Sequence, residues 1–145
     1  MPKSSKTRQR SRYLVFISHS SLDAWIAKVM VEKIEALGAE CWLDEKDLIG
    51  GDIIVEDIRR GIKACDEALI LVSPNSVKSK LVPFEIGGLR QLEKHVTPIF
   101  NNVKAQQMEP LKDIKGVDLN NFEQFLAQLK RRISHSRVRN SEAQS

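Results

Sequence analysis

The sequence predicts an α/β domain with a doubly wound, flavodoxin-like parallel sheet of five strands, for which the order 2-1-3-4-5 fits best. Two observations lead to this fold class. Short apolar, β-rich runs alternate with segments that carry a helical apolar stripe, about five times along the chain. The most continuous apolar run, Ala68–Val72, is the third strand, as is typical of a central strand covered by helices on both faces.

The remaining elements follow from strand-like runs and from helix start and stop signals. The predicted strands lie at 13–17, 40–43, 68–72, 95–100 and 116–119. Ser20 and Asp23 have the spacing of a capping pair at the start of the first helix, which Gly38 ends. The third helix is expected to begin near Pro83, because proline is tolerated in a first turn but breaks a helix interior. Asn120 opens the last helix, which is buried through an apolar stripe.

Length and charge indicate one domain between basic ends. The chain has 145 residues, and its net charge of +4 is unevenly distributed. We expect a flexible basic tail at 1–12, the domain at 13–133 and a second flexible tail at 134–145. The tails are either solvated ends or weak binders of nucleic acid or anionic membrane, and no specific nucleic-acid partner is expected.

Hydropathy and cysteine usage predict a cytoplasmic protein. The sequence has no apolar run near the roughly 20 residues that a membrane-spanning helix needs, and its basic start lacks the apolar region of a signal peptide. Its two cysteines, Cys41 and Cys65, are too few for a disulfide framework and are expected to be buried thiols in a reducing compartment.

In a doubly wound sheet, ligands bind beyond the carboxyl ends of the strands, near the switch point between strands one and three. This rule gathers 18–21, 44–52, 73–80 and the start of the third helix around one cleft. The cleft lacks the acidic pair of a phosphoacceptor receiver, a dinucleotide-binding glycine motif and a Walker loop. The histidines at 19, 95 and 135 are scattered, so no metal site is expected.

One carboxylate stands out by its position in this cleft. Glu85 is expected in the first turn of the third helix, where the helix dipole favours an ionised side chain. Spacing alone leaves two interpretations open. Glu85 is either a functional carboxylate or an exposed glutamate that only complements the dipole.

Several motifs in the right order resemble the Toll/interleukin receptor (TIR) domain family, in the style of its prokaryotic branch. Residues 16–23 resemble the first box of the family, and residues 42–52 resemble the second box and its loop. Residues 71–76 and 79–85 resemble the third strand, its loop and the helix start that bears a glutamate. The resemblance covers nearly the whole chain without its tails.

The resemblance implies an enzyme that cleaves NAD at the nicotinamide–ribose bond, as an NAD nucleosidase or an ADP-ribose cyclase in defence or stress signalling. NAD is then the substrate and no cofactor is implied. The family's catalytic glutamate falls on Glu85. The residues implied to line the NAD pocket are His19, Ser20, Asp44, Ser73 and Leu81, and those implied to form a self-association loop are Gly50, Gly51 and Asp52.

The sequence departs from the family pattern at two of these positions. Leu81 stands where the family often has an aromatic residue able to stack on nicotinamide, and His19 stands where it often has tyrosine. Either departure is expected to affect how tightly the pocket binds NAD and which nucleophile takes the ribosyl group. The alternative implied by the family is a non-enzymatic module that binds other TIR domains. Implied partners are further copies through the 44–52 loop, partner TIR domains, and an effector that reads the product.

Overall fold

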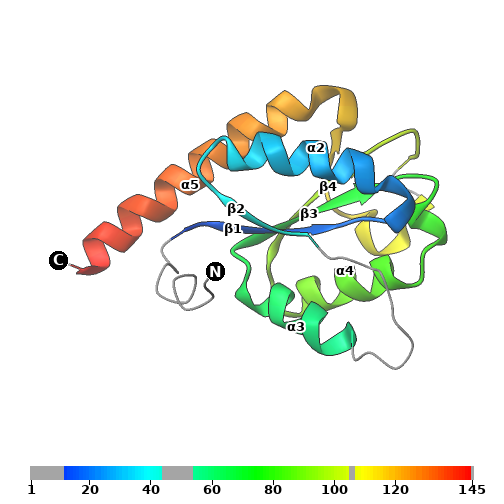
Figure 1. The fold of residues 1–145 in the computed structure, drawn as a ribbon, viewed down its shortest axis with the longest axis horizontal. Helices are drawn as coiled ribbons and strands as arrows, with labels where there is room; N and C mark the ends of the chain where they lie inside the picture. The colour runs from blue at the N-terminus through cyan, green and yellow to red at the C-terminus, as the bar shows by residue number, and fades with distance from the viewer. Residues whose placement is uncertain (1–11, 44–53, 105–106, 145) are drawn as a thin grey trace.

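The computed structural model describes residues 12–43, 54–104 and 107–144, in which strands and helices alternate (Figure 1). The strands are β1 Leu14–Ser18, β2 Glu40–Leu43, β3 Glu67–Val72, β4 His95–Phe100 and β5 Val117–Asp118. The α-helices are α2 Ala24–Glu35, α3 Ile54–Ala64, α4 Leu81–Gln91 and α5 Phe122–Gln144. Short 3-10 helices include η1 Ser21–Asp23, η2 Ser76–Lys78, η4 Glu109–Leu111 and η5 Leu119–Asn121.

The five strands form one parallel sheet in the order β2-β1-β3-β4-β5, which confirms the predicted fold class and strand order. In the register, Phe16 of β1 lies between Trp42 of β2 and Ala68 of β3. Helices α2 and α5 cover one face of the sheet, and α3 and α4 cover the other (Figure 1). In this strand order β1 and β3 are neighbours inside the sheet, so their carboxyl ends lie side by side.

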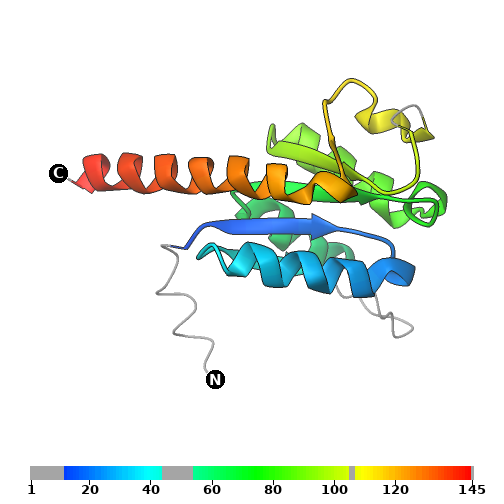
Figure 2. The ribbon, with the colours of Figure 1, turned by 90° about the horizontal axis from the view of Figure 1, so that it is seen from above.

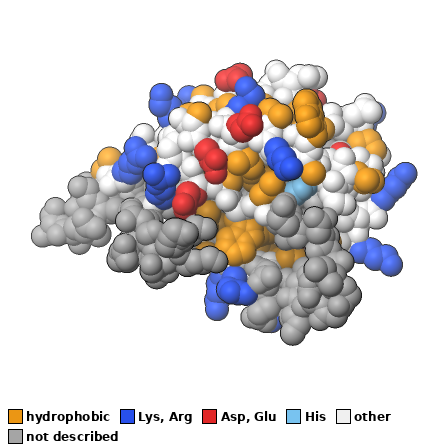
Figure 3. Space-filling view, viewed as in Figure 1, with side chains coloured by type: hydrophobic (Ala, Val, Ile, Leu, Met, Phe, Trp, Pro, Cys, Tyr) orange, Lys and Arg blue, Asp and Glu red, His pale blue; other side chains and the backbone are white. Residues whose placement is uncertain are grey.

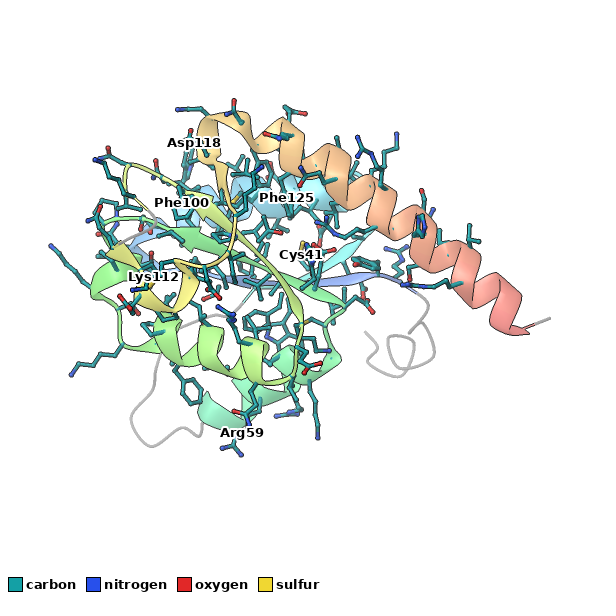
Figure 4. The ribbon with its side chains drawn as sticks, turned by 180° about the vertical axis from the view of Figure 1, so that it is seen from behind. Cys41, Arg59, Phe100, Lys112, Asp118 and Phe125 are labelled. Carbon is teal, nitrogen blue, oxygen red and sulfur yellow. The ribbon has the colours of Figure 1, made fainter. Side chains whose placement is uncertain are left out.

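Each face of the sheet has its own apolar core, because successive strand side chains point to opposite faces. Val15, Ile17 and Leu69 pack against α2 and α5, together with Phe125. Figure 4 shows Phe125 between α5 and the sheet. The alternate residues of β1 and β3 pack against α3 and α4; they are Leu14, Phe16, Ala68, Ile70 and Val72. All six residues of β3 are buried, and five of them, Ala68–Val72, form the apolar run that predicted a strand covered on both faces.

Two helix ends follow from local residues. Gly38 has a φ of 97°, a left-handed conformation that glycine adopts readily, and it follows α2 as predicted. Helix α4 begins at Leu81, before the expected start near Pro83. The hydroxyl of Ser79 accepts hydrogen bonds from the backbone N–H groups of Leu81 (3.2 Å) and Val82 (3.3 Å), and so satisfies donors of the first turn. Glu85 consequently lies in the second turn of α4, and the prediction that it lies in the first turn is wrong.

The last helix is longer than the sequence patterns indicated. Ile133 is buried, and the side chains described after it are exposed or half-buried, but α5 continues to Gln144. Figure 2 shows its final turns extending beyond the sheet. The helix therefore continues past 133, where the domain was predicted to end, and the segment contains no glycine or proline that would end a helix.

A buried ion pair joins α5 to the amino-terminal edge of the sheet. The carboxylate of Glu67, at the start of β3, is fully buried. Arg132 of α5 donates to both of its oxygens, at 2.7 and 2.8 Å, and the Tyr13 hydroxyl donates to Oε1 at 2.7 Å. Burial, together with this carboxylate, raises the pKa of Tyr13 above its ordinary value. These three hydrogen bonds offset the free energy that is lost when the Glu67 carboxylate is removed from water.

Among the helices that the structure describes, none is long and apolar enough to cross a membrane.

Candidate active site

Buried polar side chains gather at the carboxyl ends of β1 and β3. Within the described residues, the buried polar or charged side chains other than Glu67 and Thr97 all lie in this region; they are Ser18, His19, Ser20, Asp23, Ser73, Ser76 and Glu85. Burying a polar group is unfavourable unless it is hydrogen-bonded, so such a concentration requires a local network. It lies at the switch point where ligands bind in doubly wound sheets.

Glu85 is at the centre of this region. Its side chain is 0% exposed, and the hydroxyl of Ser18, the last residue of β1, donates a hydrogen bond to Oε1. The contact spans 67 residues of sequence and ties α4 to the end of β1. The interpretation of Glu85 as an exposed glutamate that complements the helix dipole is therefore wrong.

A second network joins the two loops that flank the site. Asp23 is 6% exposed, and its carboxylate accepts hydrogen bonds from the hydroxyl of Ser73 and from Nδ2 of Asn75, the latter at 2.8 Å. The Ser73 hydroxyl in turn accepts from the backbone N–H groups of Asn75 and Ser76, at 3.2 and 3.1 Å. The connection after β1 is thus fastened to the connection after β3.

This network corrects the predicted capping pair. Ser20 caps η1, by accepting from the backbone N–H of Leu22 at 3.2 Å. Asp23 makes no side-chain capping bond to α2, because its carboxylate is turned towards Ser73 and Asn75.

The structure brings together several of the residues that were predicted to line the pocket. His19, Ser20 and Ser73 are buried at the strand ends. Leu81 is half-buried, lies one turn before Glu85 on α4, and packs against the core between the sheet and the helices α3 and α4. The remaining predicted residues lie outside the described residues; they are Asp44, Gly50, Gly51 and Asp52.

Sequence reasoning did not single out Ser18, Asp23 or Asn75 as site residues. Ser18 was counted only among the polar residues after the first strand, although its place at a strand end in the switch region was a usable signal. Asp23 matched a capping pattern, which hid its long-range role. Its bonds to Ser73 and Asn75 join residues 50 and 52 positions apart, a pairing that local spacing does not predict.

Other reactive groups in the described residues do not form a second site. No group of three or more His, Cys, Asp or Glu side chains among them is arranged to hold a metal ion. Burial raises the pKa of the Cys65 thiol to about 11 and that of the half-buried Cys41 thiol to about 12. Both thiols are therefore protonated at neutral pH and are poor nucleophiles.

The fold and these two networks define a flavodoxin-like α/β domain with a buried carboxylate at its switch point. A sequence model described as the TIR domain matches residues 15–133. The chain belongs to the TIR domain family, as the sequence motifs indicated.

Sequence relatives cover the same region. The chain is 29% identical over 100 residues to a protein of Brachypodium distachyon named "Probable 2' cyclic ADP-D-ribose synthase BdTIR", with 68% of this chain and 45% of the relative aligned. It is 27% identical over 104 residues to "NAD(+) hydrolase TcpC" of Escherichia coli O6:H1, with 68% of this chain and 34% of the relative aligned. The chain thus spans less than half the length of these two curated relatives.

Solved structures support the fold. The TIR domain of the Toll-related receptor TRR-2 from Hydra magnipapillata aligns with a TM-score of 0.64 and 20% identity, over 83% of this chain and 97% of that one. The TIR domains of the activated Roq1 resistosome align with the same TM-score and 19% identity, over 83% of this chain and 99% of that one. At these identities the likeness shows the fold alone.

Proposed function

We propose that this domain cleaves NAD at the nicotinamide–ribose bond and that Glu85 is the catalytic carboxylate. The observation that carries the proposal is a fully buried carboxylate, hydrogen-bonded by Ser18, at the switch point of the sheet. Relatives within the same family are named for NAD hydrolysis and for the synthesis of 2' cyclic ADP-ribose, which makes NAD the proposed substrate.

The chemistry suits a site with one carboxylate. Nicotinamide leaves NAD as a neutral molecule, taking the electron pair of the C1'–N bond, so no general acid needs to protonate it. The transition state then resembles an oxocarbenium ion on the ribose. A fixed negative charge beside that cation lowers the barrier. Attack on C1' by water would give ADP-ribose and a proton, and attack by a group of the same molecule would give a cyclic product and a proton.

The burial of Glu85 implies that the site opens before catalysis. A carboxylate that is 0% exposed does not contact a substrate, so NAD needs a conformation in which Glu85 is accessible. We propose that self-association through the 44–52 loop favours this open conformation, since the two glycines of the loop lower the cost of a backbone change. Specific activity should then rise with protein concentration.

The setting of the reaction is also a proposal. We place the protein in the cytoplasm, in defence or stress signalling, with an effector that reads the product of NAD cleavage. The two free thiols fit a reducing compartment.

The test measures nicotinamide release from NAD by concentrated purified protein, with the product's mass distinguishing ADP-ribose from a cyclic form that has one water less. We expect Glu85→Gln to lower the rate about 100-fold or more, because the charge beside the developing cation is lost. Glu123→Gln is the matched control, since Glu123 is an exposed glutamate in the first turn of α5. Circular dichroism should show that both variants are folded, because the side-chain amide oxygen introduced by Glu85→Gln can still accept from Ser18.

Full burial of Glu85 also favours the alternative, a non-enzymatic module that binds other TIR domains. If the parent protein consumes no NAD when it is concentrated or driven to assemble, this alternative replaces the enzyme. If Glu85→Gln consumes NAD as fast as the parent, the catalytic group lies elsewhere.

A further inference from the structure

Positive charge is concentrated at one end of this domain. Residues 1–12 and 130–139 together contain ten of the 23 lysines and arginines and none of the 19 acidic residues, so the rest of the chain is net negative. The second segment lies next to the point where the first joins the domain, because Tyr13 and Arg132 both bind the carboxylate of Glu67 at the start of β3. This basic end is therefore at the opposite end of the strands from the candidate active site.

Helix α5 holds the cations of the second segment on its solvent side. Lys130, Arg131 and Arg139 are exposed, and within the described residues none of them has an ion-pair partner. Arg132 differs, because its guanidinium is bound to Glu67. The helix fixes the spacing of the exposed cations, so a partner need not order this backbone when it binds. By contrast, acidic side chains lie among the basic ones on the face that carries α2 (Figure 3).

A shallow hollow of about 560 Å³ lies between the cations of α5. Ala127 and Ser134, two turns apart on one face of the helix, line it with small side chains. At about 100° per residue, Lys130 lies on one side of this pair, and Arg131 and His135 lie on the other. A sugar–phosphate backbone suits this arrangement, because its sugars can lie over the small side chains while its phosphates meet cations on both sides.

We propose that the exposed side of α5 from Ala127 to Arg139, which we name the basic surface, binds the phosphate backbone of a nucleic-acid duplex. Cations that neutralise phosphates release the counterions condensed on the duplex, which favours binding and makes it salt-dependent. Seven of the ten cations in the two basic segments are arginines, whose guanidinium can donate two hydrogen bonds to one phosphate. Contacts to phosphates read no base, so binding is independent of nucleotide sequence.

Two other polyanions fit the basic surface less well. A helix that binds a membrane surface needs an apolar face, but of the exposed large hydrophobic side chains that the structure describes, Val138 alone lies on α5. Residues 1–12 contain no Leu, Ile, Val, Phe or Trp. A single strand is typically held by stacking its bases on aromatic side chains, and neither 1–12 nor 127–139 contains Phe, Tyr or Trp. A duplex keeps its bases stacked and presents its phosphates, which is what the cations of this surface require.

The experiment measures binding of the full chain to a fluorescently labelled DNA duplex by anisotropy, at salt concentrations from about 50 to 200 mM. The logarithm of the association constant should fall linearly with the logarithm of the salt concentration. We expect a slope of about −3 or steeper, because each neutralised phosphate contributes about −0.9 and the basic surface offers at least Lys130, Arg131 and Arg139. A second duplex of unrelated sequence, and an RNA duplex of the same length, should bind with similar affinity.

A pair of double variants separates this surface from net charge. Lys130→Gln with Arg131→Gln should make the slope shallower by about two and raise Kd at least about tenfold near 0.1 M salt. Arg59→Gln with Lys63→Gln is the matched control, since it removes two exposed cations from α3, on the other face of the sheet. Figure 4 shows Arg59 extending outward from α3. The control should keep the slope of the parent. Circular dichroism should show both variants folded, because the substituted side chains are exposed and glutamine is a good helix former.

A third variant tests the hollow itself. Ser134→Glu places a carboxylate between the cations without removing any of them, and should raise Kd about tenfold. Gln91→Glu adds the same charge at an exposed position of α4 and should change Kd little.

The proposal is overturned if the parent does not bind the duplex at low salt, or if both double variants weaken binding equally. Tighter binding to a single strand of the same length would also overturn it, because stacking on bases would then be the main contact. Tighter binding to vesicles of phosphatidylcholine and phosphatidylserine in equal parts would assign the basic surface to a membrane instead. No step uses NAD, so this proposal and the proposed enzyme activity can fail separately.

Discussion

The hydrogen bond from Ser18 to Glu85 can be tested by Ser18→Ala, which removes one hydroxyl from a fully buried position. Water cannot replace the hydroxyl, because both side chains are 0% exposed. A hydrogen bond to a charged group contributes about 1.5–3 kcal/mol, so we expect Ser18→Ala to lower the free energy of unfolding by that amount. The loss is measured by urea denaturation at neutral pH.

A double-mutant cycle isolates the bond itself from other effects of the substitution. In a Glu85→Gln background the acceptor is neutral, so Ser18→Ala should cost only about 0.5–1.5 kcal/mol there. The two substitutions should therefore be non-additive by about 1 kcal/mol or more. If the effects of the two substitutions on the free energy of unfolding add within about 0.5 kcal/mol, Ser18 does not stabilise the carboxylate and the reasoning is refuted.

The same variant has a kinetic signature if Glu85 acts on NAD. A carboxylate that has lost the hydrogen bond from Ser18 samples more orientations, which should raise the barrier of the chemical step more than it weakens substrate binding. We expect kcat to fall about tenfold, equivalent to about 1.4 kcal/mol of barrier, with KM little changed. An increase in KM at constant kcat would instead place Ser18 in substrate binding.

Three further predictions concern the surrounding structure. Asp23→Ala should lower the free energy of unfolding by about 1–3 kcal/mol, because it removes the acceptor of the buried Ser73 hydroxyl and of the half-buried Asn75 amide. Asn75→Ala should cause a smaller loss, and the two effects should be non-additive in a denaturation cycle. Arg132→Met should lower the free energy of unfolding by about 3–5 kcal/mol in urea denaturation, because it leaves the buried charge of Glu67 without its cation. The double variant with Glu67→Leu as well should recover much of this loss, because the buried charge is then removed. Partial desolvation, and then the positive charge of Arg132, lowers the pKa of His95, so the unfolded chain takes up this proton at a higher pH than the folded domain does. The melting temperature of the parent should therefore fall as the pH decreases through about 6.5. In His95→Gln, the melting temperature should depend less on pH in this range.

The sheet was predictable because its signals are local. The fully apolar run of β3 and the helical stripes between strands predicted both the parallel sheet and its order. Helix boundaries were less predictable where two local signals compete. Pro83 suggested a start for α4, but the Ser79 hydroxyl starts the helix two residues earlier. The end of α5 was missed because an apolar stripe reports where burial stops, whereas a helix can continue on propensity alone.

The site was predictable only in outline. The switch-point rule gathered Ser18, Ser73 and Glu85 into one region. In the structure Ser18 donates to Glu85, and Ser73 is buried at the end of the neighbouring strand β3. The partners within the region were not predictable, because they depend on side-chain directions set by packing between distant segments. Asp23 illustrates this, since its sequence context fits a helix cap and its actual partners lie in the connection that follows the neighbouring strand β3.

Among the residues whose burial the structure describes, two glutamates are fully buried, and they lie at opposite ends of the strands. Glu67 lies at the amino-terminal end of β3, where Arg132 and Tyr13 donate hydrogen bonds to its carboxylate and Arg132 thereby ties α5 to the sheet. Glu85 lies beside the carboxyl end of β1, and ligands of this fold class bind at the carboxyl ends of the strands. Burial alone therefore does not distinguish the proposed catalytic carboxylate from a structural one. The place of Glu85 at the carboxyl ends of the strands is what supports the proposal. If the domain cleaves NAD as proposed, Arg132→Met should lower stability while leaving kcat per folded molecule unchanged, whereas Ser18→Ala should lower both. Equal loss of kcat in the two variants would mean that the chemistry responds to general loosening of the fold and not to the placement of Glu85.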